Sequence, residues 1–123
     1  LSTFSEHPIT LPNIGTFPSA ECAYHALKDP HNDSYINKLK NSTSSYAKKL
    51  AKTDFKSTRE KIAAMKKIFI IKINTYPEIK QVLLNTNLRP IIFTGKDPFW
   101  GGENMIGKVW MDIRFKLIKD YKE

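Results

Sequence analysis

The sequence contains only one cysteine, Cys22, among its 123 residues. A single thiol excludes an internal disulfide framework and fits a reducing compartment, so we expect a cytoplasmic protein. The most apolar run, residues 68–73, is interrupted by Lys72 and is far shorter than the ~18 residues that span a bilayer. The first residues lack a basic segment followed by an apolar one, so we expect neither a signal peptide nor a membrane partner.

Acidic residues are also scarce. The chain has 12 Asp and Glu against 20 Lys and Arg, which gives a net charge of +8. An excess of this size attracts polyanions. The lysines are spread through residues 38–72 and 116–122, without the interleaved aromatic residues of a single-strand platform. We interpret them as a solvated basic surface that helps recruit a phosphorylated ligand or nucleic acid, and a small nucleic-acid-binding module is our third-ranked hypothesis.

Metal-ligating patterns are missing as well. His31-Asn32-Asp33 is not followed by further ligands at zinc or calcium spacing, so it is interpreted as a polar turn with Asp33 as a helix N-cap. His7 and His31 are interpreted as turn or packing residues. We expect no metal and no cofactor. Cys22 is interpreted as a small buried thiol rather than a nucleophile, because free cysteine commonly packs in cores.

The residues that are present suit one domain over residues 1–123. Hydrophobic residues make up 41% and charged residues 26%, and there is no internal repeat or linker. Turn residues and apolar periodicity locate the expected elements. A hairpin is expected with strands near 7–11 and 16–17, and a further short strand over 89–93. Helices are expected over 20–28, 34–39, 43–52, 77–84 and about 104–119. One more helix, of about 17 residues, is expected to begin with Ser57 or Thr58 as its cap.

The helix expected over residues 20–28 carries the densest chemistry. Ser19 is its expected N-cap. A carboxylate, a phenol, an imidazole and an amine recur at spacings of three, four and seven, which places them near one helix face. These residues are Glu21, Tyr24, His25 and Lys28. An ordinary solvated pair of Glu21 with His25, and a core role for Tyr24, are the structural alternatives.

A second functional candidate is the loop at residues 94–102, TGKDPFWGG. Gly95-Lys96 is not a phosphate-binding P-loop, because Pro90 stands where the upstream glycine is required. Loops dense in glycine with Asp and Trp often carry function. The alternative is that Trp100 fills the core and Asp97 closes an Asx turn.

Several motifs together resemble the NADAR or YbiA-like family. That family has an early Ser-Asn-Phe, a His-Pro-Ile segment, a Trp-Pro-Thr-x-Glu-His…Gln-Ala-x-Lys helix, and later Asp-x-x-Trp-Gly, Gly-x-Asn-x-Leu-Gly and Leu-Met-x-x-Arg. Order and spacing agree over nearly the whole chain. The matching segments are STFS at 2–5, HPI at 7–9, FPSAECAYHALK at 17–28, DPFWG at 97–101, GENMIG at 102–107 and WMDIR at 110–114.

This resemblance implies a predominantly helical α+β fold, a single YbiA-like domain with a small N-terminal hairpin. It also implies an N-glycosidase that cleaves bonds to ribose. The substrates would be ribosylamino-pyrimidine phosphates of riboflavin synthesis or ADP-ribose on guanine bases. The expected partner is therefore a phosphorylated ribosyl or ADP-ribosyl small molecule, or an ADP-ribosylated nucleic acid.

The resemblance also assigns roles to matching residues. Glu21 would be the main carboxylate, acting as acid or base. Asp97 would be a second polar group near the ribose, and Lys28 would bind phosphate or attack the anomeric carbon. Tyr24 and Trp100 would wall the pocket, while Asn104 and Arg114 would hold phosphate or orient the loop. The expected substrate-binding residues are Phe4, Tyr24, His25, Trp100, Gly101, Asn104 and Arg114.

The chain also departs from the family pattern. Thr3, Phe17, Cys22 and His25 stand where the family has Asn, Trp, His and Gln, an expected Trp falls near Ser57, and an expected acidic residue appears as Phe93. We infer a divergent member with altered substrate preference. The second hypothesis is therefore a protein that binds or sequesters an ADP-ribose-derived nucleotide without cleaving it.

Overall fold

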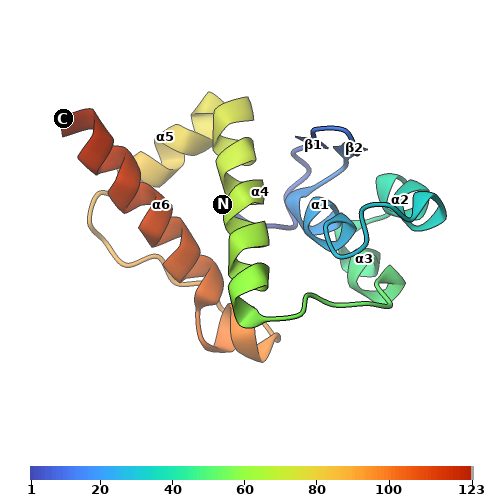
Figure 1. The fold of residues 1–123 in the computed structure, drawn as a ribbon. Helices are drawn as coiled ribbons and strands as arrows, with labels where there is room; N and C mark the ends of the chain where they lie inside the picture. The colour runs from blue at the N-terminus through green and yellow to red at the C-terminus, as the bar shows by residue number, and fades with distance from the viewer. Residues whose placement is uncertain (123) are drawn as a thin grey trace. The chain divides into compact units, whose positions relative to one another are not determined.

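A computed structural model describes residues 1–122 of the chain. The chain forms two compact units, Leu1–Thr75 and a second that begins at Tyr76 (Figure 1). Helices dominate both units, and one small hairpin lies near the N-terminus. The predicted helical α+β fold class is confirmed. That the two units make up one domain stays a prediction. None of the helices in the described part of the chain is long and apolar enough to cross a membrane.

The hairpin pairs strand β1 (Ile9–Leu11) with strand β2 (Gly15–Phe17) in antiparallel register. Ile9 and Phe17 face each other and are fully buried, whereas the intervening threonines point to solvent. This alternation is what a two-residue side-chain period produces on a half-buried ribbon. The turn is closed by two residues with positive φ, Asn13 at 65° and Gly15 at 138°. The predicted hairpin is thus confirmed.

Helix α1 (Ala20–Ala26) is the central element of the first unit. It contacts both strands and the helices α2 (Asp33–Lys40), α3 (Ser44–Leu50) and α4 (Thr58–Thr75). Ser19 caps it as predicted, because the Ser19 hydroxyl accepts a hydrogen bond from the Cys22 amide. The helix ends two residues earlier than predicted. Its short length and complete enclosure make α1 a buried platform for its side chains.

Helix α4 packs against α1 and β1. The spacing of Ile62, Met65, Phe69 and Ile73 predicts a core-facing stripe on this helix; the last three are buried, whereas Ile62 is half-buried. Ser57 begins the helix, because its hydroxyl accepts a hydrogen bond from the Glu60 amide. The stripe also contains Lys72, which sequence periodicity does not place in the core. This side chain is 0% exposed.

The second unit contains α5 (Pro77–Asn85), a π-helical turn η1 (Pro98–Gly102) and α6 (Met105–Lys122). Helix α6 contacts both α5 and η1. Val109, Trp110 and Ile113 form the buried stripe of α6, as predicted. Pro77 occupies the first turn of α5, where its missing amide hydrogen costs nothing.

The strand predicted at residues 89–93 is wrong: this segment has no regular secondary structure. Side chains rather than a neighbouring strand pair with its backbone, and Asn104 supplies two of these hydrogen bonds. The Asn104 amide donates to the Ile91 carbonyl at 2.9 Å, and its oxygen accepts from the Phe93 amide at 2.8 Å. An apolar, β-branched segment joins a sheet only where a neighbouring strand pairs with its backbone. Here the Asn104 side chain pairs with backbone groups of the segment instead.

Two local predictions in the first unit also need correction. The cap of α2 is Asn32 rather than Asp33, because the Asn32 oxygen accepts from the Tyr35 amide. The apolar pattern of residues 43–52 predicts a buried stripe of Tyr46 and Leu50 on α3, and this is wrong for Tyr46. Its side chain is 53% exposed, and the residue that α3 buries is Ala47.

Candidate functional site

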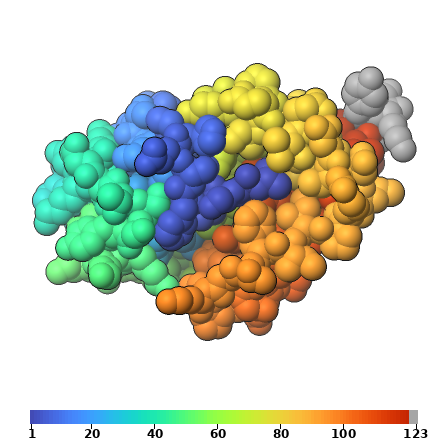
Figure 2. Space-filling view, turned by 180° about the vertical axis from the view of Figure 1, so that it is seen from behind, coloured from blue at the N-terminus to red at the C-terminus, as the bar shows by residue number. Residues whose placement is uncertain are grey.

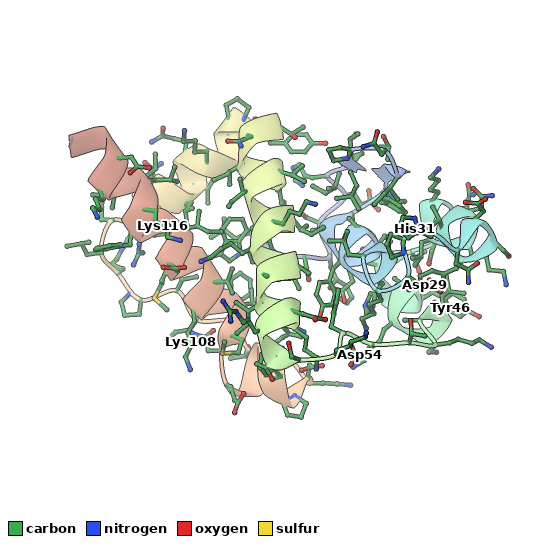
Figure 3. The ribbon with its side chains drawn as sticks, viewed as in Figure 1. Asp29, His31, Tyr46, Asp54, Lys108 and Lys116 are labelled. Atoms are coloured by element: carbon green, nitrogen blue, oxygen red, sulfur yellow. The ribbon has the colours of Figure 1, made fainter. Side chains whose placement is uncertain are left out.

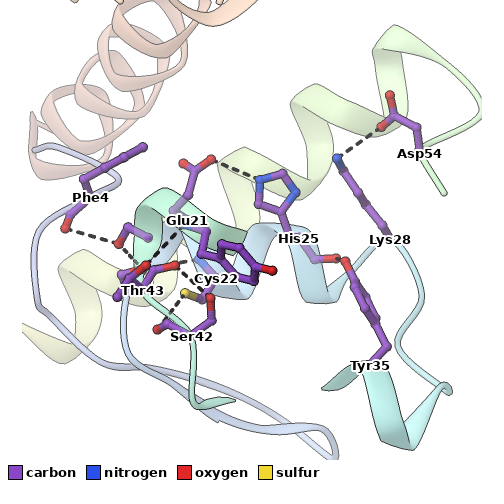
Figure 4. Close-up of polar contacts among 12 residues, drawn as sticks. Phe4, Glu21, Cys22, His25, Lys28, Tyr35, Ser42, Thr43 and Asp54 are labelled. Atoms are coloured by element: carbon purple, nitrogen blue, oxygen red, sulfur yellow. Dashed lines mark hydrogen bonds and ion pairs between the residues drawn. The ribbon is translucent and has the colours of Figure 1, made fainter. Parts of the chain in front are cut away.

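The predicted polar cluster of α1 begins with a pair one helical turn apart. His25 Nε2 lies 3.1 Å from Glu21 Oε1 (Figure 4). The carboxylate is 16% exposed and the imidazole side chain 3%. The pair is therefore not the solvated surface pair that was the structural alternative. Its carboxylate is held at a fixed position with only a narrow opening to solvent.

His25 has one further property that decides its chemistry. Its Nδ1 atom is buried and has no hydrogen-bond partner among the residues that the structure describes. Burying an N–H group without an acceptor costs more free energy than burying a nitrogen lone pair without a donor. The Glu21 carboxylate can only accept hydrogen bonds, so its partner must be a donor. The arrangement therefore favours the tautomer with its proton on Nε2, donated to Glu21. In this tautomer the Nε2–H of His25 donates to the Glu21 carboxylate.

Tyr24 and Lys28 continue the same cluster. The Tyr24 ring is buried and meets the His25 ring edge-on, with 5.3 Å between centroids. Lys28 Nζ lies 5.5 Å from the centre of the Tyr24 ring, a cation–π distance. The Glu21 carboxylate is close enough to favour the charged form of Lys28. All four side chains predicted to converge on one helix face are thus brought together in the first unit.

Lys28 has a partner that the sequence did not suggest. Its Nζ lies 3.6 Å from Asp54 Oδ1, and its side chain is 10% exposed. Burial lowers the pKa of Lys28, and the Asp54 carboxylate opposes that shift. The slight burial of Asp54 acts to raise the pKa of its carboxyl group. The hydrogen bond from the Phe55 amide and the ammonium groups of Lys28 and Lys61 outweigh this effect, so the pKa of Asp54 is lowered.

Asp54 and Phe55 are therefore site residues that sequence reasoning missed. Phe55 packs at 5.4 Å from Tyr24, ring centre to ring centre, and extends the aromatic wall beside the cluster. One signal was available: Asp54 is the only acidic residue between Ser34 and Arg59. A lone carboxylate in a stretch rich in lysine is a reason to look for a specific cation near it.

Two other residues near α1 have simpler roles. Cys22 is fully buried, and burial raises the pKa of its thiol, which disfavours the thiolate. The predicted packing role of Cys22 is consistent with both observations. Phe4, a predicted substrate-binding residue, is 52% exposed, and its carbonyl accepts a hydrogen bond from the Ser44 hydroxyl. Its ring is available at the surface of the first unit.

The loop of the second unit holds Asp97, Trp100 and Gly101. Asp97 Oδ1 accepts hydrogen bonds from the Phe99 and Trp100 amides at 2.9 and 3.0 Å, which is the Asx geometry that starts η1. Trp100 is half-buried and meets Phe99 edge-on at 4.7 Å. The core tryptophan is Trp110 instead. Asp97 therefore shapes the turn that presents Trp100.

Gly101, Asn104 and Arg114 are structural anchors of this loop. A Cβ atom added to Gly101 would lie 2.5 Å from the Gly95 nitrogen, so the two backbones meet only without a side chain. Arg114 is buried and donates from Nη1 to the Thr86 hydroxyl at 2.8 Å and to the Arg89 carbonyl at 2.6 Å. Arg114 thus holds the segment that precedes the loop, and the two roles predicted for Asn104 and Arg114 stay predictions.

The predicted site residues fall into two groups, one in each unit. Within the described residues, no three His, Cys, Asp or Glu side chains are grouped so as to hold a metal ion. His7 Nδ1 bonds the Ser5 hydroxyl in a local turn, and His31 is exposed. The group in the first unit is Glu21, Tyr24, His25 and Lys28, and the group in the second is Asp97, Trp100, Gly101, Asn104 and Arg114.

Comparison with known proteins identifies the fold. No model of a protein family matches the chain, and no curated protein sequence matches it. Among solved structures, the NMR structure of the Escherichia coli protein YbiA is similar, with a TM-score of 0.79. The match covers 99% of this chain and 79% of YbiA at 24% sequence identity. The chain therefore has a YbiA-like fold.

Proposed function

From this fold and the polar cluster of α1, we propose that the protein is a hydrolase that cleaves an N-glycosidic bond to ribose. The substrate is an ADP-ribose-like or ribosyl-phosphate compound, such as ADP-ribosylated guanine or a ribosylamino-pyrimidine phosphate. The observation that supports the proposal most directly is the pairing of Glu21 with His25 on a buried helix. A carboxylate with a fixed orientation and limited solvent access suits acid–base chemistry.

The reaction breaks the bond between C1′ of ribose and a nitrogen of the base, and it adds water to C1′. As the bond breaks, positive charge develops on the ring oxygen and C1′, which a nearby carboxylate stabilises. Glu21 accepts a proton from the attacking water and then passes it to the leaving nitrogen, which restores the carboxylate. His25 donates its Nε2 hydrogen bond to Glu21 throughout and holds the carboxylate in one orientation.

Lys28 supplies positive charge next to this carboxylate. Its Nζ faces both the Asp54 carboxylate and the Tyr24 ring, and both favour the ammonium form. An ammonium in this position suits the phosphate of the substrate. The second role carried over from the family resemblance, attack of the amine on C1′, requires a neutral amine and is tested separately below.

The test is a turnover assay followed by mass spectrometry. We would incubate the protein with ADP-ribosylated guanine DNA, NAD, cyclic isomers of ADP-ribose and a ribosylamino-pyrimidine phosphate. Wild type is expected to consume one of them and release a free base or ribose product. Glu21→Gln should lower the rate by about a hundredfold or more, the usual contribution of a positioned acid–base group. Glu78→Gln, an exposed carboxylate on α5, is the matched control and should retain full activity.

Two results would contradict the proposal. Full activity of Glu21→Gln would remove Glu21 from the mechanism. A compound that co-purifies with the protein and remains intact after long incubation would instead indicate sequestration. The replacement of the family's acidic residue by Phe93 is what favours this second function.

A further inference from the structure

A groove on the first unit has no part in the chemistry proposed above. It runs across α2 and α3, which lie side by side (Figures 1 and 2). One hollow of about 370 Å³ is lined by Lys38, Lys49, Lys52, Tyr35 and Tyr46, with small polar residues between them. This volume falls within the range of small-ligand pockets.

The hollow continues past Tyr46. A second hollow of about 620 Å³ also has Lys38, Tyr46 and Leu50 in its lining, and it extends to Asn41, Ser42 and Thr43. The two hollows therefore adjoin at the Tyr46 ring, which is 53% exposed and labelled in Figure 3. We call the pair the α2–α3 groove. Because the two hollows share part of their lining, a ligand made of several units could occupy both.

The charge of this surface is predominantly positive, with three lysines and one aspartate in the lining of the first hollow. Between Ser34 and Thr53 the chain has five lysines and no acidic residue. Lys38, Lys49 and Lys52 are exposed, and none of them forms an ion pair with the residues that the structure describes. Asp29 is the one acidic residue in the lining of the first hollow, and its carboxylate accepts a hydrogen bond from Asn32 at 3.2 Å. The three ammonium groups remain available to an anionic ligand.

An aromatic face lies among these cations. Lys49 Nζ is 5.9 Å from the centre of the Tyr46 ring, so an ammonium and a stacking surface meet at the same point of the groove. Tyr46 is held there by the cap of α3, since its amide donates to the Thr43 hydroxyl. In the sequence alone, no aromatic residues are interleaved with the lysines in the manner of a single-strand platform. The fold brings them together, because α2 supplies Lys38 and α3 supplies Tyr46 and Lys49.

We propose that the α2–α3 groove binds single-stranded nucleic acid, with a base stacked on Tyr46 and phosphates contacted by Lys38, Lys49 and Lys52. A basic groove with an exposed aromatic residue is the arrangement by which proteins bind single strands without reading sequence. The recess and the free ring favour an unpaired strand over a duplex, whose bases are already stacked. This binding requires no ribosyl modification and no hydrolysis, so it is independent of the function proposed above.

The experiment measures the fluorescence anisotropy of a fluorescein-labelled oligothymidine at increasing KCl concentrations. Each phosphate contact contributes about 0.7 to the slope of log affinity against log salt for a single strand. The triple variant Lys38→Ala, Lys49→Ala, Lys52→Ala should therefore lose about 2 from the slope and bind at least about tenfold more weakly at physiological salt. Tyr46→Ala should weaken binding by about tenfold, whereas Tyr46→Phe should bind like wild type.

A control with the same change in net charge removes Lys108, Lys116 and Lys119, which are exposed on α6. This control should bind nearly as tightly as wild type. Equal loss in the two triple variants would overturn the proposal, because net charge alone would then explain the binding. So would tighter binding of a duplex with no effect of Tyr46→Ala, or equal competition by polyglutamate. Circular dichroism confirms that each variant is folded.

Discussion

His25 Nε2 lies 3.1 Å from Glu21 Oε1, while its Nδ1 is buried and has no hydrogen-bond partner in the described part of the chain. The imidazole is thus a positioning group whose one polar contact is the carboxylate. If that contact matters for turnover, the two residues should behave as a unit. Removing either one should then remove most of the effect of the other.

The first prediction tests this unit with His25→Phe, which keeps an aromatic ring against Tyr24. We expect kcat to fall about tenfold or more with little change in KM, since the carboxylate loses its orientation. The double variant with Glu21→Gln should be no slower than Glu21→Gln alone. Independent, multiplicative losses in the two single variants would show that His25 does not act through Glu21.

The second prediction concerns Lys28. Burial lowers the pKa of Lys28, and the Asp54 carboxylate opposes that shift. If Lys28 binds phosphate as an ammonium, Lys28→Met should raise KM for a phosphorylated substrate more than it lowers kcat. Lys28→Arg, which keeps the charge, should recover part of the affinity. The competing role is tested by adding borohydride during turnover and mapping modified peptides. A reduced ribosyl adduct on Lys28 would establish attack on C1′ and contradict our assignment.

The third prediction concerns stability and pH. Lys72 is fully buried and donates to the Ser2 carbonyl and the Ser5 hydroxyl, both at 2.7 Å. Burial lowers the pKa of Lys72 from 10.5 to about 8. Between these values the unfolded chain binds more protons than the folded one, so the free energy of unfolding should rise with pH from about 8 to 10.5.

Lys72→Met supplies the matched comparison. The contribution of Lys72 is complete above pH 10.5 and is lost as the pH falls through about 8. Urea denaturation of both proteins across this pH range should therefore show that the free energy of unfolding rises with pH in wild type and does not rise in Lys72→Met. Parallel pH profiles for the two proteins would mean that the Lys72 ammonium is solvated in the folded state.

The fourth prediction compares two adjacent glycines in η1. A Cβ at Gly101 would collide with the Gly95 backbone at 2.5 Å, whereas one at Gly102 would be 3.9 Å from its nearest neighbour, the Asp97 carbonyl. Gly101→Ala should lower stability by about 1–3 kcal/mol through overpacking. Gly102→Ala should change it by less than about 0.5 kcal/mol. Similar melting temperatures for the two variants would show that the Gly95 backbone shifts easily.

Much of the fold follows from local signals in the sequence. Ser19 and Pro77 mark helix starts because a hydroxyl acceptor and a missing amide hydrogen act within one turn. The i, i+4 spacing of Glu21 and His25 predicts their contact for the same reason. Each of these interactions joins residues whose separation is fixed by the helix itself, so no tertiary information is needed to foresee it.

The features that escaped prediction join residues far apart in the chain. Asp54 meets Lys28 only because the segment before α4 folds back along α1. The burial of Lys72 depends on Ser2 and Ser5, about seventy positions away in the sequence. The strand predicted over residues 89–93 failed because its apolar pattern says nothing of whether a partner strand exists. The sequence pattern indicates which side chains and backbone groups need partners. It does not indicate which distant residues supply those partners, because the tertiary fold decides that.

The clamp of Asn104 on Ile91 and Phe93 has a consequence for how the loop is closed. One amide side chain, at a residue with φ of 53°, fixes both ends of the loop that presents Trp100. The loop is therefore closed at its base by a side chain rather than by a pair of strands. Loss of that one amide would leave two backbone groups without their partners and would open the loop at its base.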